Sequence, residues 1–267
     1  MPTSYTIIGA SRGIGLEYVR QLAGRADTIV FAVVRSKQRS RHLDAAIAGL
    51  NNVHVVEADV VDFPSLQRAA QEVGAITGGK LDYLIHNAAR SERALAYRGF
   101  GDFPSMDELD ADFLDAFKVN ALGVVHSITA FLPLLRAGTK KTIVFISTGG
   151  ADPATVIAAG VAKMVAYGTT KAAALMIMTK WALQLKPEGF TVVSIAPGLV
   201  DTTGTMDELS GTDGESKKSE ANFKKAGHKI TQQTPEESVT MQLQVIDGLK
   251  PTDTGAHLPH NGKGFLD

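Results

Sequence analysis

Two side chains four residues apart, the phenol of Tyr167 and the ammonium of Lys171, form the most reactive pair in the sequence. On a helix this spacing puts both groups on one face, about 5–6 Å apart at Cβ. A phenol has a pKa near 10 and is a poor base at neutral pH, but a neighbouring cation stabilises the phenolate and lowers that pKa. The pair can therefore act as an acid–base catalyst. Taken alone, such a pair is more often an idle contact on a helix surface.

A glycine-rich segment near the amino terminus could bind phosphate. Glycines allow a sharp turn and a close approach to a pyrophosphate, and the N–H groups at a helix start favour negative charge. The Gly-x3-Gly-x-Gly spacing differs from the commoner Gly-x-Gly-x2-Gly, and by itself it also fits a plain turn. The segment follows an apolar run and opens a helical stretch, which favours a dinucleotide loop made of Gly9, Ala10, Ser11, Arg12, Gly13, Ile14 and Gly15.

The residues after the second apolar run bear on which dinucleotide is bound. In a dinucleotide-binding fold an acid at this strand end binds the ribose 2′-hydroxyl, whereas an arginine accepts a 2′-phosphate. Here the run ends in Val34, followed by Arg35 and Ser36, and Arg12 lies in the glycine loop. A guanidinium can bind a phosphate through two parallel hydrogen bonds, so we expect NADP(H) rather than NAD(H). We interpret three further cations as a solvated helix start: Lys37, Arg39 and Arg41.

Two further strand ends carry residues that suit a nucleotide. Asp59 and Val60 follow the third strand, where the carboxylate could accept a hydrogen bond from an adenine amino group. A turn or helix-capping role fits Asp59 equally well. After the fourth strand come Asn87, Ala88 and Ala89, whose small side chains would let the backbone pass close to a ligand.

Short β-rich runs alternate with helical stretches along the chain, which is typical of a parallel sheet covered by helices on both faces. We therefore predict an α/β fold, a single doubly wound, Rossmann-type domain over residues 1–267 with a seven-stranded parallel sheet. The polar, glycine-containing segment 203–234 is expected to be a flexible substrate lid. The expected strands are Tyr5–Gly9, Thr28–Val34, Val53–Glu57, Leu81–His86, Lys141–Ser147, Phe190–Ala196 and Ala256–Pro259; the main expected helices are Gly13–Ala23, Pro64–Ile76, Met106–Leu135 and Tyr167–Leu185.

Charge and composition exclude several function classes. The 27 basic and 28 acidic residues nearly cancel, so we expect no nucleic-acid partner. The absence of cysteine excludes disulfides and thiolate metal sites. The longest apolar stretch, Ala121–Leu135, contains polar residues and is shorter than the ~20 residues of a membrane span. With no signal-peptide pattern at the start, we expect a cytoplasmic protein without membrane contact. His86 and His126 are expected to be buried or interfacial, and no metal site is predicted.

These motifs, in this order, resemble the short-chain dehydrogenase/reductase family over nearly the whole chain. Each falls at the strand or helix boundary that the family pattern requires. The short carboxyl-terminal part is similar to the small carbonyl reductases and fungal ketoreductases of that family. The residues that carry the resemblance are Gly9, Gly13, Gly15, Asp59, Asn87, Ala88, Ala89, Asn120, Ile146, Ser147, Thr148, Tyr167, Lys171 and the segment from Pro197 to Thr202.

The resemblance implies a reaction and a role for each motif. NADP(H) would exchange a hydride with a small carbonyl or alcohol substrate, and Tyr167 would exchange the proton. Lys171 would hold the nicotinamide ribose and lower the tyrosine pKa, and Asn120 would anchor a water that passes protons from solvent. The segment beside the nicotinamide would contribute Pro197, Gly198, Val200 and Thr202.

Three departures from the family pattern affect the site. The family usually has two serines at the end of the fifth strand, and counting along this chain puts Thr148 at the catalytic position, with Ser147 as the fallback. A threonine hydroxyl can donate the same hydrogen bond. Ala89 stands where a glycine is frequent, and fits only with a negative φ. Tyr167 follows Thr148 by 19 positions, more than usual, and this insertion is expected to form a wall of the substrate site.

The leading hypothesis is an NADPH-dependent ketone or aldehyde reductase. A catalytically silent NADP-binding regulator and a non-redox dehydratase or cyclase on the same scaffold are the alternatives. Because family members usually assemble through the long helices that begin near Met106 and Tyr167, we expect a homodimer or homotetramer.

Overall fold

A single parallel sheet organises the protein, as a computed structural model that describes residues 2–90, 97–205, 220–221, 224–225 and 231–265 shows. Its strand order is β3-β2-β1-β4-β5-β6-β7, and all neighbours run parallel. This confirms the predicted seven-stranded doubly wound fold. The strands are β1 (Thr3–Ile8), β2 (Thr28–Val34), β3 (Val53–Glu57), β4 (Tyr83–His86), β5 (Thr142–Ile146), β6 (Thr191–Ala196) and β7 (His257–Pro259).

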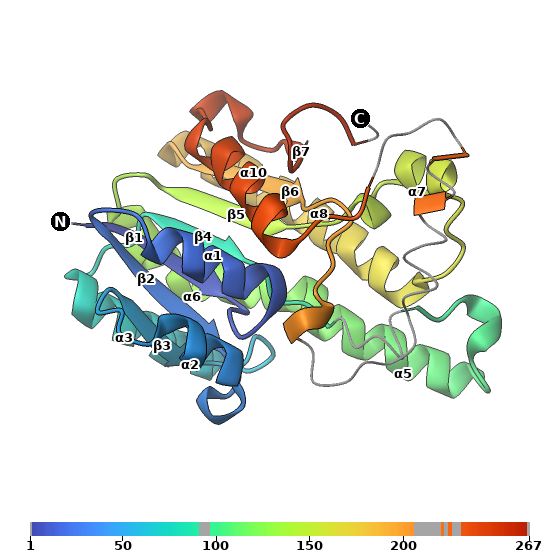
Figure 1. Cartoon of the computed structure of the whole chain (residues 1–267), viewed down its shortest axis with the longest axis horizontal. Coiled ribbons are helices and arrows are strands. Elements are labelled where there is room, and N and C mark those ends of the chain that lie inside the picture. Colours follow the sequence, from blue (N-terminus) through green and yellow to red (C-terminus); the bar gives the residue numbers. More distant parts are fainter. Residues whose placement is uncertain (1, 91–96, 206–219, 222–223, 226–230, 266–267) are drawn as a thin grey trace.

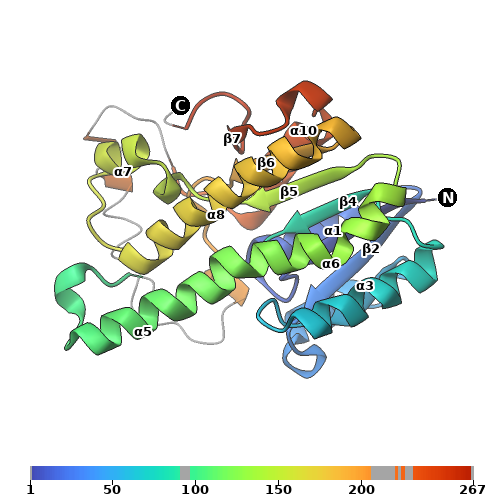
Figure 2. The same ribbon diagram turned by 180° about the vertical axis from the view of Figure 1, so that it is seen from behind.

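Helices cover both faces of the sheet and bury two apolar layers. Figure 1 shows α1 (Gly13–Ala23) and α10 (Pro235–Asp247) over one face, and α2 (Arg41–Ile47) adds Leu43 to the same apolar layer. Figure 2 shows α3 (Phe63–Thr77), α6 (Gly123–Ala137) and α8 (Val165–Leu185) over the other face. Two further helices, α5 (Met106–Phe117) and α7 (Pro153–Ala159), extend beyond the carboxyl ends of the strands.

The long helix expected over Met106–Leu135 is interrupted. A π-helical turn, Lys118–Leu122, separates α5 from α6 and contains Asn120. Single π turns inside helices frequently lie at functional sites. The continuous helical span Met106–Ala137 is long and apolar enough to suit a membrane crossing, but half of its most apolar part is buried inside the fold, where α6 packs against α3. It therefore also fits a core helix, and the absence of membrane contact stays a prediction.

Most of the expected lid, 203–234, lies outside the described residues. Within it, Thr203–Thr205 form a 3₁₀ turn, and Gln233 pairs with Val200 in an isolated parallel bridge.

The strand order reverses between β1 and β4, so the chain leaves these neighbouring strands in opposite directions across the sheet. In doubly wound sheets, ligands bind in the crevice at the carboxyl ends of the strands, at such a switch point. Gly9 and Asn87 directly follow β1 and β4, respectively. The fold thus brings the glycine loop and the Asn87–Ala89 motif to one edge.

Candidate active site

The glycine loop packs directly against the loop after β4. Gly9 has φ +87°, and a Cβ at this position would lie 2.6 Å from the Ala88 Cα. The Asn87 side-chain amide donates a hydrogen bond to the Gly9 carbonyl (2.8 Å), and its backbone N–H donates to the Ile8 carbonyl (2.9 Å). A Cβ at Gly15 would collide with the Gly9 carbonyl. The glycines are therefore required by this packing, and Ala89 has the negative φ that its side chain requires.

The start of α1 faces the segment that follows β6. The Gly13 N–H donates to the Thr205 hydroxyl (2.9 Å), and a Cβ at Gly13 would lie 3.1 Å from the Thr202 methyl. Arg12 is the N-cap residue and its side chain makes no capping bond. Since N–H groups in the first turn have no partner within their own helix, the turn of Ser11 to Ile14 presents donors here, of which the Gly13 N–H already bonds Thr205. The structure brings together the two segments predicted to hold the cofactor.

The residues predicted to contact the adenosine half lie at the ends of β2 and β3. Arg12 and Arg35 are exposed, and neither has an ion-pair partner in the described part of the chain. The Ser36 carbonyl accepts from the Ser40 hydroxyl (2.7 Å). Asp59 makes a turn, because its carboxylate accepts from the Val61 N–H (3.1 Å). The turn role that the sequence left open is therefore present, whereas its adenine contact stays a prediction.

At the other end of the site, the hydroxyls of Thr148 and Tyr167 meet. Thr148 follows β5, and its hydroxyl accepts from the Gly150 N–H (3.1 Å) and hydrogen-bonds the phenol of Tyr167, in the first turn of α8. Ser147 is buried, and its hydroxyl has no hydrogen-bond partner in the described structure. Its backbone N–H donates to the Ile195 carbonyl (2.7 Å). The geometry favours Thr148 over Ser147 as the hydroxyl beside Tyr167.

The net effect of the protein groups is to raise the phenol pKa, not to lower it as the sequence predicted. Burial is the largest cause, the nearby Tyr97 adds to it and the Thr148 hydrogen bond opposes it, and together they bring the pKa of Tyr167 to about 12. Lys171 lies with its Nζ 5.9 Å from the Tyr167 ring centroid, but burial also lowers the pKa of Lys171 to about 7. A half-protonated amine at neutral pH is a weaker stabiliser of a phenolate than a full cation. This expectation was wrong for the chain by itself, because the helix spacing did not reveal the burial of both groups.

Lys171 reaches the end of β5 from the second turn of α8. Its Nζ donates to the Ile146 carbonyl (2.6 Å) and lies 4.4 Å from the Phe145 ring centroid. A protonated amine has three N–H donors, so one hydrogen bond leaves further donors for a ligand.

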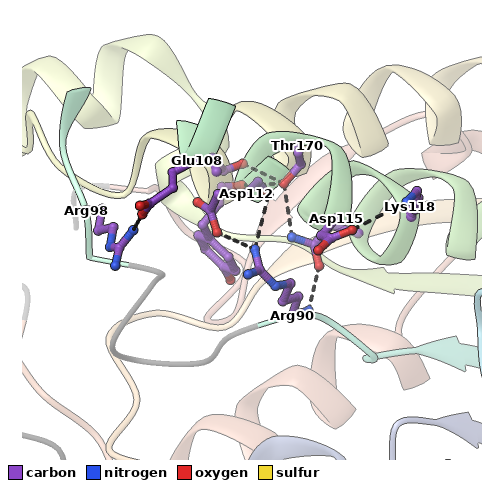
Figure 3. Close-up of polar contacts among 10 residues, drawn as sticks. Arg90, Arg98, Glu108, Asp112, Asp115, Lys118 and Thr170 are labelled. Atoms are coloured by element: carbon purple, nitrogen blue, oxygen red, sulfur yellow. Dashed lines mark hydrogen bonds and ion pairs between the residues drawn. The ribbon is translucent and has the colours of Figure 1, made fainter. Parts of the chain in front are cut away.

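Asn120 is the centre of a polar network that ties three segments together; Figure 3 shows its members Arg90, Asp112 and Thr170. Its Oδ1 accepts from the Arg90 N–H (2.7 Å), and its Nδ2 donates to the Thr170 hydroxyl (3.0 Å). The Arg90 guanidinium donates to the Asp112 carboxylate (2.6 Å) and to the Asp112 carbonyl (3.1 Å). We call Arg90, Asp112, Asn120 and Thr170 the Asn120 network. One hydrogen bond thus engages each end of the Asn120 amide, and the predicted water contact stays a prediction.

A cavity of about 710 Å³ opens beside Tyr167 and Thr148. The long insertion before Tyr167 folds into the 3₁₀ turn Gly149–Ala151 and α7, and it lines this cavity with Val156, Ala159 and Val161. The segment after β6 contributes Gly198 and Leu199. The insertion thus forms a wall of the cavity next to the phenol.

Several residues at the site were missed from the sequence. Gln233 and His260 line the cavity, and their side-chain Nε2 atoms lie 2.7 Å apart. Arg90 directly follows the Asn87–Ala89 motif, and that position was the one available signal for its role. His86 is fully buried, as expected, and burial with the nearby Lys171 lowers its pKa to about 3. His126 is half-buried, with its Nδ1 2.9 Å from the Val60 carbonyl. Within the residues described, no group of histidine and acidic side chains could hold a metal ion.

A doubly wound sheet, a glycine turn at the start of α1 and a tyrosine–lysine pair at its carboxyl edge define a dinucleotide-binding α/β protein. The model of the short chain dehydrogenase family matches residues 4–213. The chain therefore belongs to the short-chain dehydrogenase/reductase family of oxidoreductases, as the motifs had indicated.

Relatives match along nearly the full length. The short-chain dehydrogenase/reductase atnB of Arthrinium sp is 39% identical over 262 residues, covering 97% of this chain and 98% of the relative. The short-chain dehydrogenase/reductase AacuF of Aspergillus aculeatus is 36% identical over 261 residues, covering 97% of both. Among solved structures, the NADPH-bound carbonyl reductase from chicken fatty liver superposes with a TM-score of 0.77 at 25% identity, covering 98% of this chain and 93% of that chain.

Proposed function

We propose that the protein is an NADP(H)-dependent oxidoreductase that interconverts a ketone or aldehyde and the corresponding alcohol. The observation that carries the proposal is the hydrogen-bonded pair of Thr148 and Tyr167 hydroxyls at the wall of the cavity. A carbonyl oxygen placed beside this pair can accept a hydrogen bond from Thr148 while Tyr167 donates a proton to it. The apolar wall from the insertion would keep bulk water from the reacting carbon.

The residues at the opposite end suit NADP(H). The turn from Ser11 to Ile14 offers backbone donors to a pyrophosphate, since the start of a helix favours anions. The exposed guanidinium groups of Arg12 and Arg35 suit a ribose 2′-phosphate. Asp59, Val60 and the Asn87–Ala89 loop would border the adenosine half, and Pro197, Gly198, Val200 and Thr202 the nicotinamide. The NADPH bound by the chicken carbonyl reductase is consistent with this choice.

The mechanism assigns one function to each polar group. When bound, NADPH supplies the hydride that reduces the carbonyl carbon. Tyr167 donates its proton to the carbonyl oxygen, so that hydride and proton together convert the carbonyl to an alcohol. A phenol whose pKa is about 12 stays protonated at neutral pH, which suits the direction of reduction. Lys171 would offer its remaining N–H donors to the cofactor ribose, and Asn120 would hold a water that passes protons from solvent.

Assembly and location are part of the same proposal. Helices α5 and α8 contact each other, and both expose large apolar side chains, which is typical of interaction surfaces. We propose a homodimer or homotetramer built on these helices, with no nucleic-acid or membrane partner, in the cytoplasm. The exposed apolar residues are Leu114 and Phe117 of α5, and Met176 and Leu183 of α8.

The decisive experiment replaces Tyr167 by phenylalanine. Wild-type protein is expected to oxidise NADPH, followed by nicotinamide absorbance, with at least one member of a ketone and aldehyde panel. Tyr167→Phe lacks the proton donor, so turnover should fall by about 10²–10⁴-fold while NADPH binding, measured by fluorescence, persists.

Tyr83→Phe is the matched control. Tyr83 also has a pKa raised to about 12, but it stacks on Tyr5 at the amino ends of the strands. Its turnover should equal that of the wild type. Ordinary turnover by Tyr167→Phe would refute the mechanism. NADPH binding without turnover of any carbonyl would favour the silent regulator, and water loss or ring closure without NADPH consumption would favour the dehydratase or cyclase.

A further inference from the structure

Gln233 lines the cavity beside Tyr167 and carries a buried hydrogen-bond acceptor, its side-chain carbonyl oxygen. This oxygen has no hydrogen-bond partner in the described part of the structure. We propose that this oxygen selects the substrate: the enzyme prefers large, apolar, uncharged carbonyl compounds that also carry a hydroxyl or N–H donor. The inference rests on the proposed function, because it takes this cavity as the place where the carbonyl binds.

Two backbone hydrogen bonds hold Gln233 in place. Its N–H donates to the Leu199 carbonyl (2.8 Å), and its carbonyl accepts from the Asp201 N–H (2.8 Å). The residue is therefore fixed to the segment that follows β6. A Cβ at Gly198 would lie 2.8 Å from the Gln233 Nε2 and 2.9 Å from the His260 Cε1. The absence of a side chain at Gly198 thus makes room for the Gln233 and His260 pair.

His260 determines which atom of the Gln233 amide stays unpaired. The Nε2 atoms of the two side chains lie 2.7 Å apart. Burial lowers the pKa of His260, which favours the neutral ring, and a neutral imidazole has one acceptor nitrogen. Because an amide nitrogen can only donate, we infer that the His260 Nε2 is that acceptor and that it accepts from the Gln233 amide N–H. The amide oxygen is left as an acceptor, and a buried acceptor without a partner is unfavourable until a donor reaches it.

The acidic and the basic side chain of the described cavity lining, Glu237 and Lys163, already have partners. The Glu237 carboxylate accepts from the Thr234 N–H (2.9 Å) and from its hydroxyl (3.1 Å). The Lys163 ammonium pairs with Asp102 at 3.4 Å. The described lining thus holds no charged side chain without a partner, which favours an uncharged substrate.

The remaining lining is mostly apolar, and a cavity of about 710 Å³ has the size that holds drug-sized molecules. A compound of two or more rings fits this description better than a small aliphatic ketone. Its walls include Phe100, Val156, Met164, Leu199, Met241 and Phe265. A site built to bond a substrate hydroxyl discriminates strongly against the analogue that lacks it, because the protein atom is then left unpaired.

The test compares 2-acetylnaphthalene with its isomers that carry one ring hydroxyl at successive positions. The measured quantity is the ratio of kcat/KM for each hydroxylated ketone to that for the hydroxyl-free ketone, with NADPH. We expect a ratio of about ten or more for at least one isomer in the wild type. Because a ratio is compared, a general loss of activity in a variant cancels.

Gln233→Met keeps the length of the side chain and removes the acceptor, so the ratio should fall to about one. Gln233→Glu keeps acceptor oxygens and should retain the preference. Gln244→Leu, at an exposed position of α10, is the matched control and should retain it too. A preference that persists in Gln233→Met, or a wild type without any preference, would overturn the proposal.

Binding of the same ketones, measured by naphthalene fluorescence, repeats the comparison without turnover. The ratio of dissociation constants should follow the same pattern across the variants. If the wild type binds the hydroxylated isomers selectively but turns none over, the proposed reaction fails while the selection by Gln233 stands. If turnover occurs without selectivity, the reaction stands and this inference fails.

Discussion

The polar groups of the Asn120 network differ from those that face the proposed ligands in whether other protein groups hydrogen-bond to them. The side chains of the Asn120 network bond to one another or to neighbouring backbone. Arg12, Arg35 and the Gln233 amide oxygen, which we call the ligand-facing set, have no protein partner in the described residues. Groups of the first kind hold segments in place before any ligand arrives, and groups of the second kind are satisfied by what binds.

Burial explains why each polar group of the Asn120 network needs its partner. The side chain of Arg90 is 17% exposed and that of Asp112 6%. An ion pair at such a position is not by itself strong evidence for stability, but removing one partner leaves an uncompensated buried charge. The network joins the loop after β4, α5 and α8, so its loss would affect every segment that positions Tyr167.

The largest effect is expected from Asp112→Ala. It removes the carboxylate that accepts from the Arg90 guanidinium at 2.6 Å, and should lower the free energy of unfolding by about 3–5 kcal/mol, measured by urea denaturation. Asp115→Ala is the matched control on the same helix, because the side chains of Asp115 and its partner Lys118 are 60% and 61% exposed. It should cost less than about 1 kcal/mol. Equal losses would show that the network does not hold the site.

Substitution of the two hydroxyls at the end of β5 tests which of them faces the substrate and which is only buried in the fold. Thr148→Val keeps the shape and loses the hydrogen bond to the reacting oxygen, so kcat should fall by about 10²–10³-fold. Ser147→Ala should change kcat by less than about tenfold, since this hydroxyl is buried and does not line the cavity. Steady-state kinetics with one ketone measures both. The reverse order would restore Ser147 as the carbonyl-orienting residue.

The parts of the site that were predictable from sequence are those that follow strands. Parallel strands end at one edge, so Gly9 after β1 and Asn87 after β4 had to meet there, and they do. The position of Thr148 followed instead from counting along β5 against the family's two-serine pattern. Local patterns, one topological rule and the family resemblance were sufficient for these residues.

The rest depends on contacts between segments far apart in the chain. Arg90 and Asp112 are 22 residues apart, and Gln233 and His260 are 27 apart. No periodicity relates them, and only the folded chain brings them together. The π-helical turn around Asn120 has no pattern of its own in an apolar helix. The pKa of Tyr167 was wrongly predicted for a similar reason, since its burial depends on segments that the helix spacing does not contain.

Substitutions of Arg12 and Arg35 test whether these unpartnered guanidinium groups bind the 2′-phosphate of the cofactor. Each can form charge-assisted hydrogen bonds to a 2′-phosphate, worth about 1.5–3 kcal/mol. Arg35→Ala should therefore raise the Kd for NADPH by about 10–100-fold and change the Kd for NADH little; Arg12→Ala should act in the same direction. Binding titrations with both nucleotides provide the comparison. Arg39→Ala, in the exposed 3₁₀ turn after β2, is the control. Equal weakening of both nucleotides would remove the 2′-phosphate argument.

Lys171 shares a property with each kind of group. It is buried like the Asn120 network, but it has no carboxylate partner in the described structure. Burial lowers its pKa from 10.5 to about 7. Between these values the unfolded chain holds a proton that the folded chain lacks, so the free energy of unfolding should rise with pH by up to about 1.4 kcal/mol per unit. Above about pH 10 the raised pKa of Tyr167 acts in the opposite sense, because the folded chain then holds the extra proton.

The measurement is the urea midpoint of the protein without nucleotide at pH 7.5, 8.5 and 9.5. Lys171→Met should remove the rise, whereas Lys180→Met, at an exposed position of the same helix, should retain it. Identical slopes in Lys171→Met and the wild type would show that the amine is fully charged when folded. It would then belong with the groups that the protein itself satisfies. A slope that disappears only in Lys171→Met would place the lysine with the groups that await a ligand, since a negatively charged nucleotide nearby would restore its proton.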